Sequence, residues 1–183
     1  MSLKISFELS DRDLDFFRTA LQQSRDAVRD AEESEIIDAV SDVLDEIRKN
    51  EPLPDFVASR IPELETLIKM LTDDEWQLPA TDRERLLATF VYFADPEDIL
   101  PDNIPVIGYL DDVIIIELVM RELRHVRVAY DDFCEYREDF DNGKGKNIDA
   151  VIRRDRIDRR RQQLHQRMQR RSVLQKKSKL WIK

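Results

Sequence analysis

Residues 110–138 read LDDVIIIELVMRELRHVRVAYDDFCEYRE and contain neither proline nor glycine. This stretch predicts one long helix from about Leu110 to Glu138, with Asp111 and Asp112 in a first turn where the helix dipole favours negative charge. The most apolar part of the chain, residues 104–120, includes three acidic residues. A membrane span needs about 20 mostly apolar residues, so this part predicts a core helix with its entry loop and no transmembrane segment.

The sequence before this helix predicts further helices, because its apolar residues recur at intervals of three and four. Ser10 can cap a first helix, and a second begins near Ser34. A third apolar stripe, over residues 57–71, contains Pro62, which predicts either a kink or a fresh helix at that point. Residues 81–93 predict a helix that is apolar on most sides and therefore central.

Length and composition bound the architecture. The chain has 183 residues, of which 42% are hydrophobic, and this suits one domain with a buried core. Three glycines and seven prolines disfavour the many tight turns of an all-β sandwich or barrel. We therefore expect an all-α protein: a single compact domain of five or six helices with a basic helical tail at its C-terminal end.

The net charge of −9 conceals two parts of opposite sign. Residues 1–141 contain 15 basic and 36 acidic side chains, a net charge of −21, whereas residues 142–183 contain 15 basic and 3 acidic ones, a net charge of +12. The glycine-containing stretch DNGKGKN, at 141–147, is the clearest linker in the chain. The division predicts an acidic α-helical domain over residues 1–141 and a basic tail over residues 142–183.

Residues 95–112 read DPEDILPDNIPVIGYLDD and hold three spaced prolines, a glycine and a final pair of aspartates. An apolar helix precedes them and the apolar run VIII follows them. This segment resembles the signature of the YkvA-like domain of unknown function, with a core over about residues 80–138. The resemblance implies a helical fold and supplies no activity. The matching positions are Asp98, Pro101, Asp102, Pro105, Gly108, Asp111 and Asp112.

Three interpretations of this motif stay open. In the first, Pro101, Pro105 and Gly108 build a rigid crossover between two buried helices, and the aspartates accept backbone N–H groups or lie in a first helical turn. In the second, a carboxylate cluster binds Mg²⁺ or Ca²⁺, because residues 86–120 contain seven acidic and no basic side chains. In the third, a basic segment such as the tail docks against these acids.

The metal hypothesis assigns the ion to Asp98, Asp102, Asp111 and Asp112, and it gives the alternative function of a divalent-metal-binding domain or metal-dependent enzyme. The spacing of these residues matches no EF-hand loop. Other catalytic signals are missing, since the chain has no glycine-rich phosphate loop and no GxSxG, HExxH or CxxC motif. We therefore name no catalytic residue, expect no cofactor beyond that ion, and favour a protein that is not an enzyme.

The two histidines and the single cysteine predict no chemical role. His125 lies between arginines, and His165 lies in the tail, where we expect it to be solvated. Cys134 has acidic neighbours, which would raise the pKa of its thiol rather than activate it. A single cysteine excludes an intrachain disulfide and fits a reducing compartment, so we expect a cytoplasmic protein.

The basic tail carries the strongest signal for a partner. Residues 152–171 read IRRDRIDRRRQQLHQRMQRR, in which arginines surround a thin stripe of Ile157, Leu164 and Met168. Arginine suits bidentate contacts with phosphate or carboxylate groups, so nucleic acid or an acidic protein is expected, and a membrane surface is less favoured. The residues assigned to an anionic partner are Arg153, Arg154, Arg156, Arg159, Arg160, Arg161, Arg167, Arg170 and Arg171.

Two other states of the tail stay open: a solvated charged segment, and docking on an acidic surface of its own chain or of another subunit. The favoured function is a non-enzymatic α-helical interaction module whose basic tail binds an anionic partner. This expectation rests on the charge division and on the lack of catalytic motifs.

Overall fold

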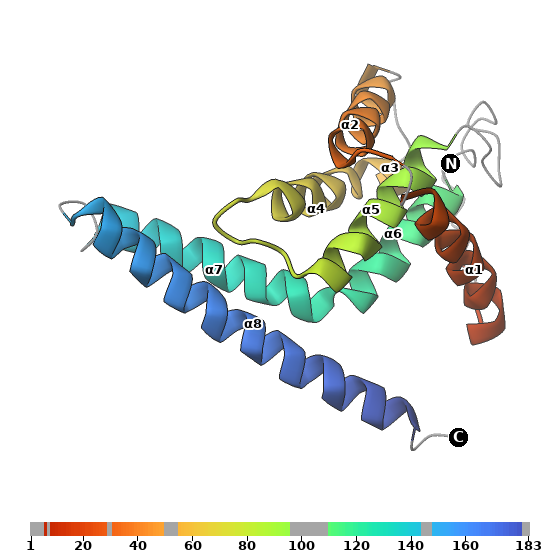
Figure 1. Ribbon diagram of the computed structural model, residues 1–183. Helices are drawn as coiled ribbons and strands as arrows, with labels where there is room; N and C mark the ends of the chain where they lie inside the picture. The colour runs from red at the N-terminus through yellow and green to blue at the C-terminus, as the bar shows by residue number, and fades with distance from the viewer. Residues whose placement is uncertain are drawn as a thin grey trace. The chain divides into compact units, whose positions relative to one another are not determined.

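The computed structural model describes residues 6, 8–28, 31–49, 55–95, 110–143 and 148–180, and their side chains except those of 25–27 and 172–180. Every regular element in these ranges is an α-helix, which confirms the all-α prediction (Figure 1). The described helices run from α1 to α8, so the predicted number of five or six helices with a tail is not confirmed. The helices are α1 (Asp11–Val28), α2 (Glu33–Lys49), α3 (Asp55–Ala58), α4 (Ile61–Thr72), α5 (Ala80–Ala94), α6 (Leu110–Glu122), α7 (Arg124–Asn142) and α8 (Ala150–Leu180).

Side chains satisfy free N–H groups at the start of α1 and of α8. The backbone N–H of Ser10 donates to Oδ2 of Asp13 at 2.9 Å, and the N–H of Asp13 donates to the hydroxyl of Ser10 at 3.4 Å. This reciprocal arrangement is a capping box, and it confirms Ser10 as the cap. At the start of α8, the N–H of Val151 donates to Oδ1 of Asp149 at 2.8 Å.

The stripe over residues 57–71 forms two helices, α3 and α4. The N–H of Arg60 bonds to the carbonyl oxygen of Val57 at 2.8 Å, and the N–H of Glu63 bonds to that of Arg60 at 3.0 Å. Pro62 is the second residue of α4, a position where an N–H would have no acceptor within the helix. Of the two outcomes predicted for this proline, the fresh helix is therefore confirmed.

The stretch over residues 110–138 differs from the single helix that was predicted, because the chain forms α6 and α7 with a break at Leu123. This residue has φ −91° and ψ 8°, in the region between strand and helix conformations. Its carbonyl oxygen accepts the N–H groups of Val126 at 2.8 Å and Arg127 at 2.9 Å, which starts α7. The side chain of Leu123 is 1% exposed. The break therefore accompanies the burial of a leucine, and no proline or glycine marks it in the sequence.

The chain divides into two compact units. Unit 1 comprises residues 1–64 and 84–119. Helix α5 is buried on most sides in the part that lies in unit 1, which confirms the prediction of a central helix. An ion pair of 3.2 Å joins Arg60 to Glu117 of α6. The buried residues of α5 are Leu86, Leu87, Ala88, Thr89, Phe90, Tyr92 and Phe93.

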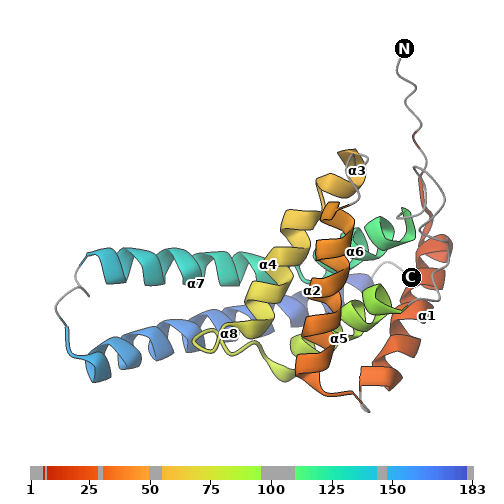
Figure 2. The same ribbon diagram turned by 90° about the horizontal axis from the view of Figure 1, so that it is seen from above.

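Unit 2 comprises residues 65–83 and 120–183. Within it, α7 and α8 lie side by side and antiparallel, as two views of the hairpin show (Figures 1 and 2). At the end of α7, the N–H of Gly143 donates to the carbonyl oxygen of Asp139 at 3.0 Å. A Cβ at this glycine would stand 2.8 Å from the same oxygen, so a larger residue would disturb this helix end.

The apolar stripe of the predicted tail is buried in unit 2. Ile157, Leu164 and Met168 are 1%, 2% and 3% exposed. Over residues 150–171, α8 therefore contributes to a core and is not a solvated segment. The predicted domain boundary at residue 141 was based on charge and remains a prediction. In the structure, residues 120–183 form one compact unit with residues 65–83.

Candidate functional site

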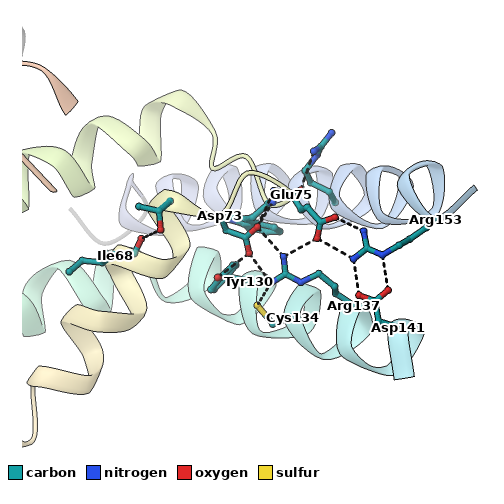
Figure 3. A network of polar contacts seen from close by, with 11 residues as sticks. Ile68, Asp73, Glu75, Tyr130, Cys134, Arg137, Asp141 and Arg153 are labelled. Atoms are coloured by element: carbon teal, nitrogen blue, oxygen red, sulfur yellow. Dashed lines mark hydrogen bonds and ion pairs between the residues drawn. The ribbon is translucent and has the colours of Figure 1, made fainter. Parts of the chain in front are cut away.

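The turn between α4 and α5 carries two acids that meet α7 and α8. Oδ1 of Asp73 accepts the backbone N–H groups of Glu75 at 3.0 Å and Trp76 at 3.1 Å, which forms an Asx turn. The N–H of Gln77 bonds to the carbonyl oxygen of Asp73 at 3.0 Å, and Gln77 takes a φ of 49°, uncommon for a residue other than glycine. The fold of this turn directs the carboxylates of Asp73 and Glu75 toward α7 (Figure 3).

Arg137 of α7 binds both of these acids. Its Nη2 lies 2.9 Å from Oδ2 of Asp73, and its Nη1 lies 3.0 Å from Oδ1 of Asp73 and 3.2 Å from Oε2 of Glu75. The contact with Asp73 is bidentate, the geometry in which arginine binds a carboxylate most strongly. Tyr130, two turns earlier on α7, donates its hydroxyl to Oδ2 of Asp73 at 3.2 Å. The Asp73 side chain is 10% exposed, so these bonds replace most of its hydration.

Arg153 of α8 extends this network across the hairpin. Its Nη1 lies 2.5 Å from Oε1 of Glu75, and its Nη2 lies 2.7 Å from Oδ2 of Asp141 on α7. Nη1 of Arg161, further along α8, donates to the backbone carbonyl oxygen of Glu75 at 3.1 Å. The charged side chains therefore tie the turn, α7 and α8 together (Figure 3).

The network holds its carboxylates in the charged form. Hydrogen bonds from Arg153 lower the pKa of Glu75 and that of Asp141. Burial acts to raise the pKa of Asp73, but hydrogen bonds from Arg137 and from the backbone outweigh it, and the pKa is lowered. Burial raises the pKa of Tyr130, which keeps its hydroxyl protonated as a donor. Carboxylates that stay ionised near neutral pH can hold helices together through ion pairs, but they are poor donors of a proton.

Trp76 is the aromatic centre of unit 2. Its side chain is fully buried, and its ring centroid lies 5.2 Å from that of Phe133 and 4.6 Å from that of His165, which meets it edge-on. The prediction that His165 is solvated is therefore wrong. Burial lowers the pKa of its imidazole, and the positive charge of Arg161 lowers it further. The aromatic contact joins α8 to the same turn as the charged network does.

Cys134 lies beside the network, in an environment that does not activate a thiol. Nη2 of Arg137 lies 3.8 Å from its Sγ. Burial raises the pKa of the thiol, and the negative charges of Asp73 and Asp131 add to this effect. The predicted direction is confirmed, although burial, and not the acidic neighbours, is the larger cause.

Several of the nine arginines assigned to a partner are engaged within unit 2. Besides Arg153, Arg167 forms an ion pair with Asp132 of α7. The guanidinium carbon of Arg160 lies 5.3 Å from the ring centroid of Tyr136 on α7, in a cation–π contact. These arginines flank the buried apolar stripe of α8 and attach the helix to α7.

The remaining arginines of α8 are exposed. Arg159 pairs with Asp155 on the same helix at 3.0 Å, and both side chains are exposed. Such a surface pair contributes about 0.3–0.5 kcal/mol, so it leaves the guanidinium available to a partner. Four further arginines are exposed and form no ion pair with the described part of the chain: Arg154, Arg156, Arg170 and Arg171.

The structure describes two of the four predicted metal ligands. Asp111 and Asp112 lie in the first turn of α6, as expected from the helix dipole. Asp111 is 2% exposed, and the hydroxyl of Tyr92 lies 3.5 Å from its Oδ2, at the limit of a hydrogen bond. The other motif residues lie outside the described ranges: Asp98, Pro101, Asp102, Pro105 and Gly108.

In the ranges that the structure describes, no group of three or more histidine, cysteine, aspartate or glutamate residues is arranged to hold a metal ion. Because Asp98 and Asp102 lie outside these ranges, the Mg²⁺ or Ca²⁺ site stays a prediction. The same holds for the structural roles assigned to Pro101, Pro105 and Gly108.

Sequence reasoning gave no role to Asp73, Glu75 or Arg137. One signal did point to the turn, since Trp76 is a large aromatic residue in a short acidic segment between two helices, and such a side chain is well buried on average. The partners of the acids, however, are separated from them by 57 to 78 residues. Local spacing identifies no contact at that separation.

Among the helices that the structure describes, none combines the length and the apolar character that a membrane crossing requires. No match was found among curated proteins or among solved structures. Residues 85–118 match the family described as a protein of unknown function (DUF1232), with which the YkvA-like resemblance is consistent. This match covers most of α5 and α6 with the segment between them, while the charged network of unit 2 lies outside it.

Proposed function

We propose that this protein is a non-enzymatic α-helical interaction module that binds an anionic partner through the exposed arginines of α8. The observation that carries the proposal is the exposure of Arg154, Arg156, Arg170 and Arg171, which form no ion pair with described residues. An arginine guanidinium can bind a carboxylate or phosphate with two parallel hydrogen bonds.

The scaffold beneath these arginines strengthens the proposal. Leu164 and its apolar neighbours on α8 are buried, and Arg153 and Arg167 attach the helix to the rest of unit 2. A helix that is already ordered loses less conformational entropy on binding than a flexible basic tail would. The arginines therefore divide into those that hold α8 in place and those that face a partner.

The non-enzymatic part of the proposal is supported by the charged network. In the described ranges, its carboxylates, Asp73, Glu75 and Asp141, all have a lowered pKa and are bound by arginine. Such groups do not exchange protons near neutral pH, which general acid–base catalysis requires. We also propose a cytoplasmic location, because the single cysteine fits a reducing compartment.

Binding is tested by fluorescence anisotropy with the full chain and labelled duplex DNA, duplex RNA and poly-glutamate, at about 50 mM and about 300 mM KCl. Arg156→Gln combined with Arg170→Gln should weaken binding about tenfold and, for a nucleic acid, lower the salt slope by about 2.

The matched control removes the same charge from two exposed arginines outside α8. Arg12→Gln combined with Arg124→Gln should leave the affinity within about twofold of the wild type, because neither residue belongs to the proposed surface. Absence of binding to all three polyanions at low salt, or equal losses in the two double variants, would contradict the proposed function.

A further inference from the structure

We infer that the anionic partner of α8 is an acidic stripe on α7 of a second copy of this chain, so that the protein associates with itself through α7 and α8. The inference rests on the proposed function and names its partner. It requires a basic stripe and an acidic stripe that are both exposed, complementary in charge and similar in length.

The basic stripe lies on α8, on the side away from its buried residues. Its members follow one another at intervals of four and three residues, so they share one face of the helix. All of them are exposed, and the buried stripe that contains Leu164 lies opposite. The basic stripe is Ile152, Arg156, Arg159, Gln163, Gln166 and Arg170.

The acidic stripe lies on α7 with the same spacing. Its members are exposed, and they lie away from the buried face that includes Tyr130 and Phe133. Asp131 forms a long pair of 4.0 Å with Arg127, while Glu135 and Glu138 form no ion pair with described residues. The acidic stripe is Val128, Asp131, Glu135, Glu138 and Asn142.

The two helices carry opposite charge. The sequence of α7 contains three basic and six acidic residues, a net charge of −3, and that of α8 contains twelve basic and two acidic residues, a net charge of +10. The pairs inside the hairpin, such as Arg167 with Asp132 and Arg153 with Asp141, use residues outside both stripes. Within the stripes, Arg159 and Asp131 form exposed pairs with neighbours on their own helices, and such surface pairs are weak enough to leave both charges open to an intermolecular contact.

The acidic and basic stripes are also similar in length and in the number of exposed apolar residues. At 1.5 Å per residue, the acidic stripe is about 21 Å long and the basic stripe about 27 Å long. Each stripe contains one of the large apolar residues that unit 2 exposes, Val128 at 39% and Ile152 at 51%. Two helices whose facing residues repeat at intervals of three and four can pack along their length, and opposite charges then select the pairing.

A second copy fits these observations better than nucleic acid does. The acidic stripe belongs to the helix beside α8, so the negative charge of Glu135 and Glu138 reduces the attraction of the hairpin for a phosphate backbone. Like charges disfavour that complex. The same carboxylates are attractive to the arginines of another copy.

Sedimentation velocity on the full chain tests the inference, at about 50 mM and about 500 mM NaCl. The wild type should form a larger species at low salt and return to the monomer at high salt. Glu135→Arg combined with Glu138→Arg should stay monomeric, and so should Arg156→Glu combined with Arg170→Glu, because each places like charges opposite one another. An equimolar mixture of these two variants should associate again, since the reversed stripes attract each other.

A charge-matched control changes two exposed acids of α2, which lies in unit 1. Asp38→Arg combined with Asp42→Arg should associate as the wild type does. Circular dichroism verifies that each variant is helical, and Glu135→Gln with Glu138→Gln replaces any reversal that fails to fold. This neutral variant should also lose the association.

Three results would overturn the inference: a monomer at low salt, association that survives both reversals, or a mixture that stays monomeric. If the wild type is monomeric at low salt and yet binds a polyanion through Arg156 and Arg170, self-association is wrong and the proposed function stands. If it neither associates nor binds any polyanion, both are wrong.

Discussion

Asp73 shows how one side chain can serve a turn and a tertiary contact together. Its Oδ1 accepts two backbone N–H groups of its own turn, and its carboxylate receives the guanidinium of Arg137 from a helix 64 residues later in the chain. The turn itself restricts the carboxylate, so less side-chain entropy is lost when the ion pair with Arg137 forms.

Asp73→Asn should lower the free energy of unfolding by about 2 kcal/mol, because the amide keeps an acceptor for the turn and loses the charge that Arg137 needs. Asp74→Asn is the matched control at the next position, where the side chain is exposed, and it should change the stability by less than about 0.5 kcal/mol. Urea unfolding of both variants measures the difference. Equal effects of the two substitutions would show that the network adds nothing to stability.

His165 should make the stability depend on pH. Its pKa is lowered in the folded protein, whereas in the unfolded chain it lies near about 6.5. The unfolded state therefore binds the proton more readily, and stability from this group is fully present above about pH 6.5 and is lost as the pH falls from there through the folded pKa. Asp73 and Glu75 also have a lowered pKa, and they lose their contribution in a separate, more acidic window.

His165→Phe keeps a ring against Trp76 and removes the titrating group. Urea midpoints measured from about pH 8 to about pH 5 should vary less in this variant than in the wild type, because the histidine term is gone. His125 is present in both proteins, so the comparison isolates the contribution of His165. Identical pH profiles would exclude His165 as the source of the dependence.

At the scale of the element, α8 is a basic helix that belongs to a core. Its apolar stripe is narrow, but Leu164 and Ile157 are almost fully buried, and Arg153 and Arg161 reach the turn beside them. The aliphatic part of an arginine side chain can cover apolar surface while its guanidinium group binds a carboxylate. A helix with few apolar residues can therefore still pack against a core. The arginines that form no ion pair with described residues remain exposed.

Leu164→Ala should destabilise unit 2 by about 3 kcal/mol, the usual cost of truncating a buried leucine and leaving a cavity. Gln163→Ala, one residue earlier and exposed, should change the stability by less than about 0.5 kcal/mol. Thermal and urea unfolding of the two variants provide the measurement. A Leu164 variant as stable as the Gln163 variant would mean that α8 does not pack as described.

Removal of residues 143–183 should expose Trp76. The deletion takes away His165 and Arg153, which contact the turn that holds this tryptophan, and the buried Leu164. We expect a red shift of its emission, measured in a Trp181→Phe background so that Trp76 is the single tryptophan. An unshifted emission spectrum would contradict the packing of α8 against Trp76.

At the scale of the whole molecule, charges that are distant in sequence compensate one another. The acidic part of the chain supplies Glu75 and Asp141, and the basic part supplies Arg153, whose side chain is 30% exposed beside a Glu75 that is 37% exposed. Pairs of this exposure contribute less than about 1 kcal/mol each and are weakened by salt. The net charge of −9 gives no indication of this arrangement.

Raising NaCl from about 0.1 M to about 1 M shortens the Debye length from about 10 Å to about 3 Å, so the urea midpoint reported by Trp76 should fall. Arg153→Met keeps most of the side-chain volume and removes the charge, and its midpoint should fall less. Unfolding curves of both proteins in the Trp181→Phe background test this. A larger salt effect in Arg153→Met than in the wild type would contradict it.

The sequence by itself determined the features that rest on local physics. Apolar spacing predicted helices, Ser10 was identified as a cap, Pro62 marked a kink or a fresh helix, and the first turn of α6 was expected to be acidic. The family signature within residues 85–118 was also recognisable locally, because its prolines, glycine and aspartates lie in one short segment of the chain. Each of these depends on residues within a few positions of one another.

The tertiary structure alone decided how the charges are used. It broke the helix at the buried Leu123, paired Asp73 with Arg137, and placed His165 against Trp76. These contacts join segments about 60 to 90 residues apart, and their free energy depends on desolvation in the folded protein, which no local pattern encodes. The sequence could therefore predict a basic helix, whereas the fold determined which of its arginines attach it to unit 2 and which remain exposed.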